Sequence, residues 1–233
     1  KTEDAAKEIA TLRPGAKVIG IGNVDVRKIQ TIKEAADRTV KELGRIDHVI
    51  AGAAGNFLSD FNHLSSNAFK SVIDIDLLGS FNTVKVCFEE LRKNKGSVIF
   101  VSATLHYYGL PMQLHASAAK AGVDALSNAL AVELGPLGIR FNCIAPGAIG
   151  GTEGMLRLSP PNETPLEQKI PLQRQGTTTD IADATIYLFS PAASYVTGDV
   201  LVVDGAWWQV GGFLGDLYPS LVIHQNEDPQ GKL

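Results

Sequence analysis

The stretch QLHASAAKAGVDALSNALAVELGPLGIRFNCIAPG, residues 113–147, decides which fold the sequence predicts. Its first part predicts one long helix, because apolar residues recur at steps of three and four, at Ala119, Val123, Leu126 and Leu130. Gly135 is expected in the left-handed position that ends a helix, and Pro136 prevents the helix from continuing. The apolar run IRFNCIA that follows predicts a buried strand, closed by Pro146 and Gly147.

Two further features of this helix concern its surface. Small residues form a second stripe, at Ala118, Gly122, Ala125 and Ala129. Such a stripe lets another helix approach closely, either from the same chain or from a second copy. Lys120 lies among these small residues, and its ammonium either extends into solvent, as most lysines do, or reaches a specific partner.

Length and composition limit the classes of protein. With 233 residues, 45% hydrophobic and 20% charged, the chain is an ordinary globular protein of one large domain or two small ones. A net charge of −4 gives no reason to expect a nucleic-acid partner. No apolar run is long enough to span a membrane, which takes about 18 residues. No signal peptide is visible.

The two cysteines, Cys87 and Cys143, have no metal-type spacing. We interpret both as reduced residues packed inside the protein. The chain begins with Lys1 inside an expected helix, so we expect the native chain to begin earlier.

Helices and strands alternate along the chain, which predicts a doubly wound α/β fold with a parallel sheet covered on both faces. We find no repeat or linker and therefore expect a single domain over residues 1–233. The expected helices span residues 3–12, 28–43, 67–94, 113–134 and 180–190, the last with a capping box formed by Thr177 and Asp180. The expected strands span residues 16–26, 46–55, 97–103, 139–145 and 199–205.

Small or polar turns follow four of these strands, at residues 25–26, 52–55, 102–104 and 145–152. Since ligands of such sheets lie at the carboxyl ends of the strands, the turns predict a floor for a flat ligand. The glycine fingerprint G-x-G-x-x-G of dinucleotide-binding folds is absent, because Asp25 occupies the third glycine position after Gly20 and Gly22. Either the ligand differs, or the chain lacks the first strand, its Gly-rich turn and the second strand.

Two acidic residues leave alternatives open. Asp25 ends a predicted strand, where it can accept a hydrogen bond from an adenine amino group or cap the next helix. Asp76, flanked by Ile75, Leu77 and Leu78, lies either at a solvent edge or in the interior with a raised pKa.

Other residues give weaker signals. The histidines at 48, 63, 106, 115 and 224 are not spaced for a metal, so we expect them on the surface or hydrogen-bonded. No G-x-S-x-G motif supports a hydrolase. We expect Trp207, Trp208 and Phe213 to be packing or interface residues.

Several stretches together resemble the short-chain dehydrogenase/reductase family. They cover nearly all of residues 16–206 and are Asp25-Val26, IDHVIAGAAG, DIDLLGSFN, SVIFVSA, Lys120, GIRFNCIAPGAI and SYVTGDVLVVDGA. Three positions depart from the family's usual pattern. Ala116 stands where the catalytic Tyr is expected, Ala103 where the Ser is expected, and Asp76 where the helix Asn is expected. A carbonyl–alcohol reaction needs the Tyr hydroxyl, so the departures disfavour it.

One branch of the family, the 2,4-dienoyl-CoA reductases, lacks that tyrosine. The segments AAGNF at 53–57, DID at 74–76, HASAAK at 115–120 and GTEG at 151–154 resemble its peroxisomal members. The resemblance implies NADPH-dependent reduction of 2,4-dienoyl-CoA to 3-enoyl-CoA in the β-oxidation of unsaturated fatty acids. The C-terminal Gly231-Lys232-Leu233 is similar to the Ser-Lys-Leu address, which implies a peroxisomal location and an import receptor as partner. A cytoplasmic location is the alternative.

The resemblance also implies roles for individual residues. Lys120 would hold the nicotinamide ribose and favour the developing anion, and Asp76 would hold the water that supplies the proton. The other NADP(H)-binding residues would be Asp25, Val26, Pro146, Gly147, Ala148, Ile149 and Thr152. The acyl-CoA-binding residues would be Arg27, Phe57, Ser65, Ser66, Asn67 and Arg157, with a substrate loop around residues 148–171. Tyr107 and Tyr108 are candidate donors to the thioester.

Two other functions compete with this one. The first is a short-chain reductase acting on another acyl-CoA or carbonyl substrate, and the second is a catalytically silent cofactor-binding protein. The residues that choose NADPH over NADH normally follow the family's second strand, so this preference rests on the resemblance alone. A homodimer or homotetramer through the small-residue helix face is expected, and no metal site is expected.

Overall fold

The computed structural model describes residues 1–158 and 165–211. Their centre is a four-stranded parallel sheet in the order β1-β2-β3-β4. The strands are β1 His48–Ala51, β2 Ser97–Val101, β3 Arg140–Pro146 and β4 Val200–Val203. Ala51 pairs with Phe100, and Pro146 pairs with Val203, so the carboxyl ends of the strands meet at one rim.

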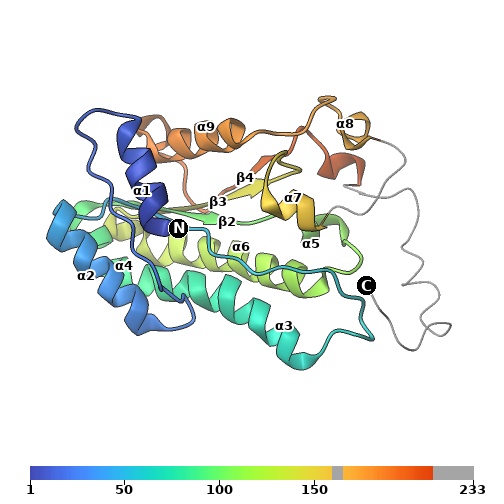
Figure 1. The fold of residues 1–233 in the computed structure, drawn as a ribbon, viewed down its shortest axis with the longest axis horizontal. Helices are drawn as coiled ribbons and strands as arrows, with labels where there is room; N and C mark the ends of the chain where they lie inside the picture. The colour runs from blue at the N-terminus through green and yellow to red at the C-terminus, as the bar shows by residue number, and fades with distance from the viewer. Residues whose placement is uncertain (159–164, 212–233) are drawn as a thin grey trace.

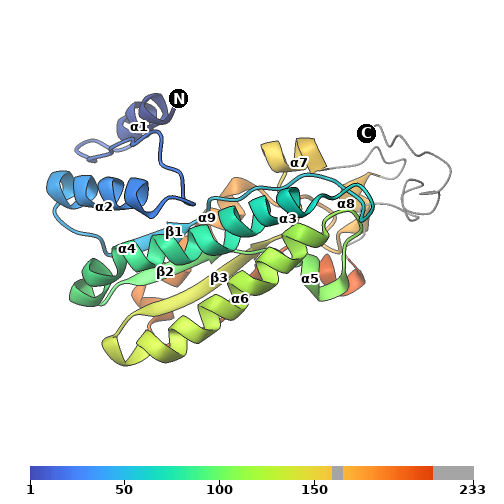
Figure 2. The same ribbon diagram turned by 90° about the horizontal axis from the view of Figure 1, so that it is seen from below.

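Helices cover both faces of this sheet. They are α1 Thr2–Thr11, α2 Ile29–Leu43, α3 Ser66–Ile73, α4 Gly79–Asn94, α5 Leu105–Tyr108, α6 Leu114–Leu134, α7 Glu153–Leu158, α8 Leu166–Lys169 and α9 Thr178–Phe189. Figures 1 and 2 show α4 and α6 side by side on one face and α9 on the other. Among the described helices, none combines the length and the apolar character needed to cross a bilayer. The fold is therefore the α/β architecture that the sequence predicts.

Alternate residues of each strand build the two halves of the core, because successive side chains of a strand point to opposite faces. Val98 and Phe100 of β2 join Phe141 and Cys143 of β3 in the cluster beneath α4 and α6. Ile99 and Ile144 pack on the other face, against Leu188 of α9 and Ala193. The central strands are buried on both faces, which explains their largely apolar sequences.

Local residues determine the ends of several helices, and the predicted capping box is confirmed. Gly44 ends α2 in the left-handed conformation, at φ 96°. Thr177 and Asp180 form the capping box of α9, and Ser65 caps α3 by accepting a hydrogen bond from Ala68 N. Both cysteines are free and buried, and burial raises the pKa of Cys87 to about 11 and that of Cys143 to about 12.

The expected strand at residues 16–26 is wrong, because this segment has no strand assignment. Strand β1 pairs only with β2 and forms one edge of the described sheet. Segment 16–22 therefore has no ladder partner, and it runs against α1 instead. A Cβ added to Gly20 would lie 2.6 Å from the Thr2 carbonyl oxygen.

Three expected segments differ in detail. The expected helix 67–94 is divided by a π-helix, η1, at Asp74–Leu78. The loop after β2 contains α5, and the expected loop 148–171 contains α7 and α8.

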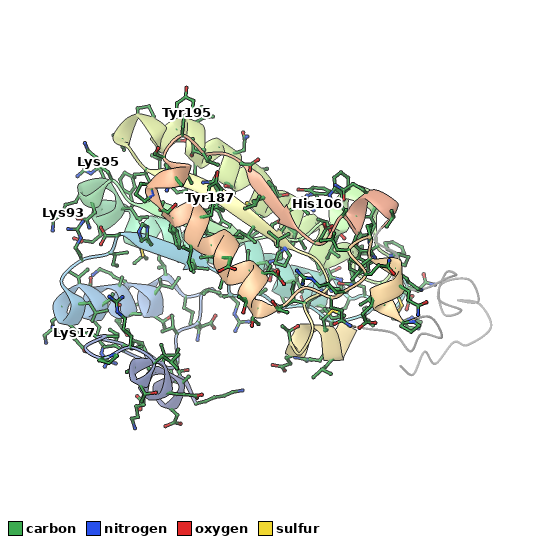
Figure 3. All side chains as sticks on the ribbon, turned by 90° about the horizontal axis from the view of Figure 1, so that it is seen from above. Lys17, Lys93, Lys95, His106, Tyr187 and Tyr195 are labelled. Atoms are coloured by element: carbon green, nitrogen blue, oxygen red, sulfur yellow. The ribbon has the colours of Figure 1, made fainter. Side chains whose placement is uncertain are left out.

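The single-domain assignment stays a prediction. Figure 3 shows charged side chains such as Lys17, Lys93 and Lys95 projecting from the periphery.

The end of α6 also differs from the prediction. Gly135 is right-handed, at φ −53°, and begins a 3-10 turn, η2, at Gly135–Leu137. The left-handed residue is Gly138, at φ 81°. Pro136 fits the first turn of the short helix, so the chain makes one more turn before it reverses.

These two glycines should respond oppositely to alanine. Gly138→Ala should lower the free energy of unfolding by about 1–2 kcal/mol, because a Cβ is strained at positive φ and would press on the Lys95 side chain. Gly135→Ala should be neutral or stabilising by up to about 1 kcal/mol, since its conformation suits alanine. Urea unfolding measures both values, and equal losses would contradict the assignment.

Candidate functional site

Asp76 and Lys120 form a buried ion pair beneath the rim of the sheet. Asp76 lies in η1 between α3 and α4, and Lys120 lies in the second turn of α6. The Lys120 Nζ is 3.0 Å from Asp76 Oδ2, and the two side chains are only 10% and 1% exposed. The sequence left two alternatives open for each of these residues. The structure shows that Asp76 lies in the interior and not at a solvent edge, and that Lys120 reaches a specific partner and does not extend into solvent.

Local structure brings the two groups together. A π-helix adds a residue to a turn, and this changes which side chains face the neighbouring helix. Gly122 of α6 lets η1 approach, because a Cβ there would lie 2.8 Å from Leu77 Cδ2. This part of the small-residue stripe therefore serves a contact within the chain, whereas Ala118, Ala125 and Ala129 are exposed.

Hydrogen bonds complete the surroundings of the pair. Gly55 N, in the turn after β1, donates to Asp76 Oδ1 at 2.7 Å, and Lys120 Nζ donates to the Val101 carbonyl at 2.9 Å. An ammonium has three N–H donors, so Lys120 has one donor left for a ligand or water. The site is a fixed, partly satisfied cation at the carboxyl ends of β1 and β2.

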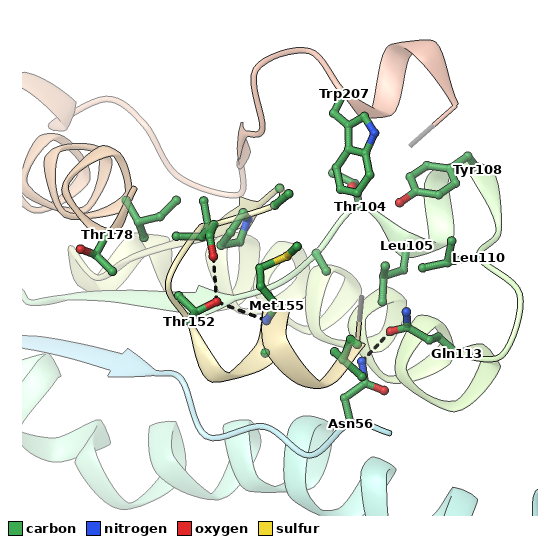
Figure 4. Close-up of a pocket in the computed structure, with 18 residues that line it drawn as sticks. Asn56, Thr104, Leu105, Tyr108, Leu110, Gln113, Thr152, Met155, Thr178 and Trp207 are labelled. Carbon is green, nitrogen blue, oxygen red and sulfur yellow. Dashed lines mark hydrogen bonds between the residues drawn. The ribbon is translucent and has the colours of Figure 1, made fainter. Parts of the chain in front are cut away.

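A pocket of about 460 Å³ opens at the same rim. It lies between the turn after β3, helix α7 and the N-terminal end of α6 (Figure 4). Apolar residues form most of its lining, including Leu105, Leu110, Met155 and Trp207. The polar side chains in its lining are Asn56, Thr104, Tyr108, Gln113, Thr152 and Thr178.

Six of the eight predicted cofactor residues lie at two hollows, and Asp25 and Lys120 line neither of them. Pro146, Gly147, Ala148, Ile149 and Thr152 all line the pocket. The Thr152 hydroxyl donates to Ile149 O at 2.8 Å and accepts from Met155 N at 3.3 Å, so it begins α7. Val26 borders a smaller hollow of about 200 Å³, together with Gly52, Ala53 and Ser80.

Asp25 does not cap the next helix with its side chain, because the N-cap of α2 is Lys28 and no side-chain hydrogen bond caps this helix. Arg27 binds its carboxylate with two hydrogen bonds, at 2.9 and 2.8 Å. These bonds lower the pKa of Asp25 to about 2. The Asp25 backbone carbonyl accepts from Lys28 N just before α2. Contact of Asp25 with adenine stays a prediction.

The predicted acyl-CoA residues are spread over a wider area. Phe57 stacks on His115, with ring centroids 4.3 Å apart. Ser65 is the cap of α3, and Ser66 and Asn67 lie in its exposed first turn. Arg27 is paired with Asp25, and Arg157 on α7 is paired with Glu153 at 3.3 Å. None of these six is among the residues that line the described pocket, and their roles stay predictions.

The two tyrosines proposed as thioester donors behave differently. Tyr108 lines the pocket, but Tyr107 does not. The Tyr107 hydroxyl instead lies 3.5 Å from Asp124 Oδ2, and its ring meets Trp208 edge to face. Burial, with the charge of Asp124 second, raises the pKa of Tyr107 to about 12.

The sequence did not single out His115, Asn56 or Gln113. His115 is 0% exposed, and neither ring nitrogen has a hydrogen-bond partner among the described residues. Burial lowers the pKa of His115, against the opposing effects of the Phe57 backbone and the Asp76 charge. The sequence signal that could have pointed to His115 was its position directly before Ala116, where the family's catalytic Tyr is expected. No group of metal-ligating side chains occurs within the described ranges.

Comparisons with known proteins agree on one family. Residues 1–207 match the family described as enoyl-(acyl carrier protein) reductase. Peroxisomal 2,4-dienoyl-CoA reductase SPS19 of Saccharomyces cerevisiae is 61% identical over 226 residues, which cover 96% of this chain and 77% of that protein. The peroxisomal 2,4-dienoyl-CoA reductase of Danio rerio is 48% identical, covering 89% and 70%. A short-chain dehydrogenase crystal structure from Bacillus anthracis has TM-score 0.76 and 34% identity, covering 89% and 83%.

The buried pair should show strong energetic coupling. Asp76→Asn alone should cost about 3–5 kcal/mol of unfolding free energy, because it leaves the Lys120 ammonium buried without its counter-charge. Adding Lys120→Met should recover part of this loss. A double-mutant cycle measured by denaturant unfolding tests the coupling. The exposed pair Lys33–Asp37 is the control, with coupling of about 0.5 kcal/mol or less. Additive losses at Asp76 and Lys120 would contradict the prediction.

His115 should make stability depend on pH. Its pKa is lowered in the folded protein, so the unfolded chain binds more protons below its own pKa of about 6.5. Stability should therefore be full above pH 6.5 and fall as the pH decreases through the lowered pKa. His115→Phe keeps a ring stacked on Phe57 and should flatten this part of the curve. Unfolding midpoints measured across this pH range test it, and an unchanged slope would contradict it.

Proposed function

This chain belongs to the short-chain dehydrogenase/reductase family, and from its buried Asp76–Lys120 pair we propose that it reduces 2,4-dienoyl-CoA to 3-enoyl-CoA with NADPH. The observation that carries the proposal is a fixed ammonium at the rim, 3.0 Å from Asp76, in a site that has Ala116 and Ala103 in place of a hydroxyl acid and its serine. The identities to peroxisomal 2,4-dienoyl-CoA reductases support the same reaction.

Membership of this family implies a nicotinamide cofactor, and the residues present fit one. Small residues of the turn after β3, Pro146, Gly147 and Ala148, offer a surface on which a flat ring can lie. Lys120 has one N–H donor beyond those given to Val101 and Asp76. When bound, the cofactor supplies a hydride to the far end of the conjugated diene. We infer NADPH rather than NADH from the similarity to the reductases named above.

The reaction needs a cation more than it needs an acid group on the protein. Addition of hydride to the diene moves negative charge through the conjugated chain to the thioester oxygen. A proton then adds at the carbon next to the carbonyl, and the product is the 3-enoyl-CoA. Lys120 lowers the energy of the anionic intermediate by its charge, and one such oriented donor contributes about 3–4 kcal/mol.

Asp76 acts mainly by holding Lys120 in place. One of its oxygens accepts from Gly55 N and the other faces Lys120, and the side chain is 1% exposed. This burial leaves little room for a water on the carboxylate itself. Asp76 therefore keeps the ammonium charged and oriented, while the remaining donor of Lys120 binds the nicotinamide ribose.

We further propose a peroxisomal location, supported by the names of the relatives. The C-terminal Gly231-Lys232-Leu233, proposed to bind an import receptor, lies outside the described residues. Assembly into a homodimer or homotetramer is proposed through the exposed alanines of α6, at Ala118, Ala125 and Ala129.

Activity should depend on the buried pair and not on its neighbours. In the full-length protein, including any residues that precede Lys1, Lys120→Ala should lower kcat for 2,4-hexadienoyl-CoA by about 10²–10³-fold. Asp76→Ala should lower kcat strongly as well. Asp74→Ala is the matched control, because Asp74 lies in the same π-turn but pairs with Lys70 on the surface. It should leave kcat nearly unchanged.

NADPH absorbance follows the reaction, and product analysis checks that a 3-enoyl-CoA forms. Near-normal rates in Lys120→Ala and Asp76→Ala would overturn the mechanism. Absent turnover in the unmodified protein, with normal NADPH binding, would favour the silent cofactor-binding alternative. Turnover of a 3-oxoacyl-CoA instead would favour the other reductase alternative.

A further inference from the structure

Two side chains from distant parts of the chain join across the pocket. Asn56, in the loop after β1, donates from Nδ2 to Gln113 Oε1 at 2.6 Å. Gln113 precedes the first turn of α6 and is 3% exposed. Both residues line the pocket, and Figure 4 shows their hydrogen bond at the end where α6 begins.

The direction of this hydrogen bond follows from the backbone. Phe57 N–H can only donate, and it donates to Asn56 Oδ1 at 2.8 Å. The other end of the Asn56 amide is therefore the NH₂ group, and the atom that it meets on Gln113 must be the oxygen. Consequently Gln113 Nε2 points away from Asn56. In Figure 4 this nitrogen faces the side of the pocket that carries Leu105, Leu110 and Tyr108.

Within the described residues, the structure shows no acceptor for Gln113 Nε2. Gln113 Nε2 is not among the buried side-chain atoms that lack a partner, so it is open to the pocket, where water or a ligand can accept its hydrogen bond. Leu105 and Leu110 on that side of the pocket are apolar, and the Tyr108 hydroxyl is the polar group there. Nε2 is therefore an oriented, neutral donor that faces an apolar cavity.

A ligand suited to this cavity has an apolar chain and one strong hydrogen-bond acceptor. An acyl thioester has this composition, because its carbonyl oxygen accepts and its unsaturated chain is apolar. Gln113 lies seven residues before Lys120 on the same face of α6, about 10 Å along the helix axis. Lys120 itself is not among the residues that line this pocket.

Resting on the proposed function, we propose that Gln113 Nε2 donates a hydrogen bond to the thioester carbonyl oxygen of the substrate. Asn56 is a positioning residue that holds the amide in this orientation. The bond strengthens as the oxygen becomes negative in the dienolate, so Gln113 stabilises the intermediate together with Lys120. No proton leaves the amide, and protonation still occurs at the carbon next to the carbonyl.

The test compares a thioester with an analogue that lacks the acceptor. In calorimetry with the full-length protein and NADP⁺, the unmodified protein should bind 3-hexenoyl-CoA at least tenfold more tightly than the thioether with CH₂ in place of the carbonyl. Gln113→Leu and Gln113→Met should lose this preference. Their kcat for 2,4-hexadienoyl-CoA should fall about 10²-fold, as for one oxyanion donor. Gln30→Leu, at an exposed glutamine of α2, controls for the substitution itself.

The outcomes separate this inference from the proposed function. Turnover by the unmodified protein, with thioester preference and kcat unchanged in both Gln113 variants, would overturn the role of Gln113 alone. Absent turnover in the unmodified protein would overturn the proposed function first. Weaker NADP⁺ binding in the variants, with thioester preference retained, would show that the amide serves the cofactor and would also overturn the inference. If Gln113→Leu does not fold, Gln113→Met, whose volume is close to that of glutamine, decides the question.

Discussion

The structure depends on a buried charge that must keep its partner. An ammonium removed from water is tolerated only beside an opposite charge and further acceptors, and Lys120 has both in Asp76 and the Val101 carbonyl. This requirement explains the irregular features around it. The π-turn orients Asp76, Gly122 allows η1 to approach α6, and the Gly55 amide binds the second carboxylate oxygen. Loss of any of these would leave a charge without compensation.

The pair also separates two tasks that a tyrosine usually combines in this family. The resemblance implies a hydroxyl acid at the position of Ala116, where this chain offers only a methyl group. A dienoyl thioester needs its oxygen stabilised as an anion but not protonated, and a fixed cation and a neutral amide suit that need. The apolar lining of the pocket increases the effect of the amide, and burial increases that of the ammonium, because electrostatic interactions are stronger where water is excluded.

Much of the fold was predictable because it depends on local patterns. The strands Ser97–Val101 and Arg140–Pro146 are mostly apolar, and α6 has its apolar stripe, so their types follow from local patterns. The predictions failed where pairing or chain reversal decides the outcome. Residues 16–26 have the composition of a strand but no neighbouring strand in the described sheet. Gly135 and Gly138 both suit a helix end, and only the 3-10 turn between them determines which one is left-handed.

By itself, the sequence determined the parallel α/β fold, its family resemblance, and Asp76 and Lys120 as the charged residues to examine. Tertiary structure alone decided that these two meet, that His115 is buried, and that Asn56 orients Gln113. The physical reason is the range of the interactions. Periodicity and capping act over a few residues, whereas 44 positions separate Asp76 from Lys120 (120 − 76) and 57 separate Asn56 from Gln113. Contacts of that kind arise only when the sheet brings the ends of its strands to one rim.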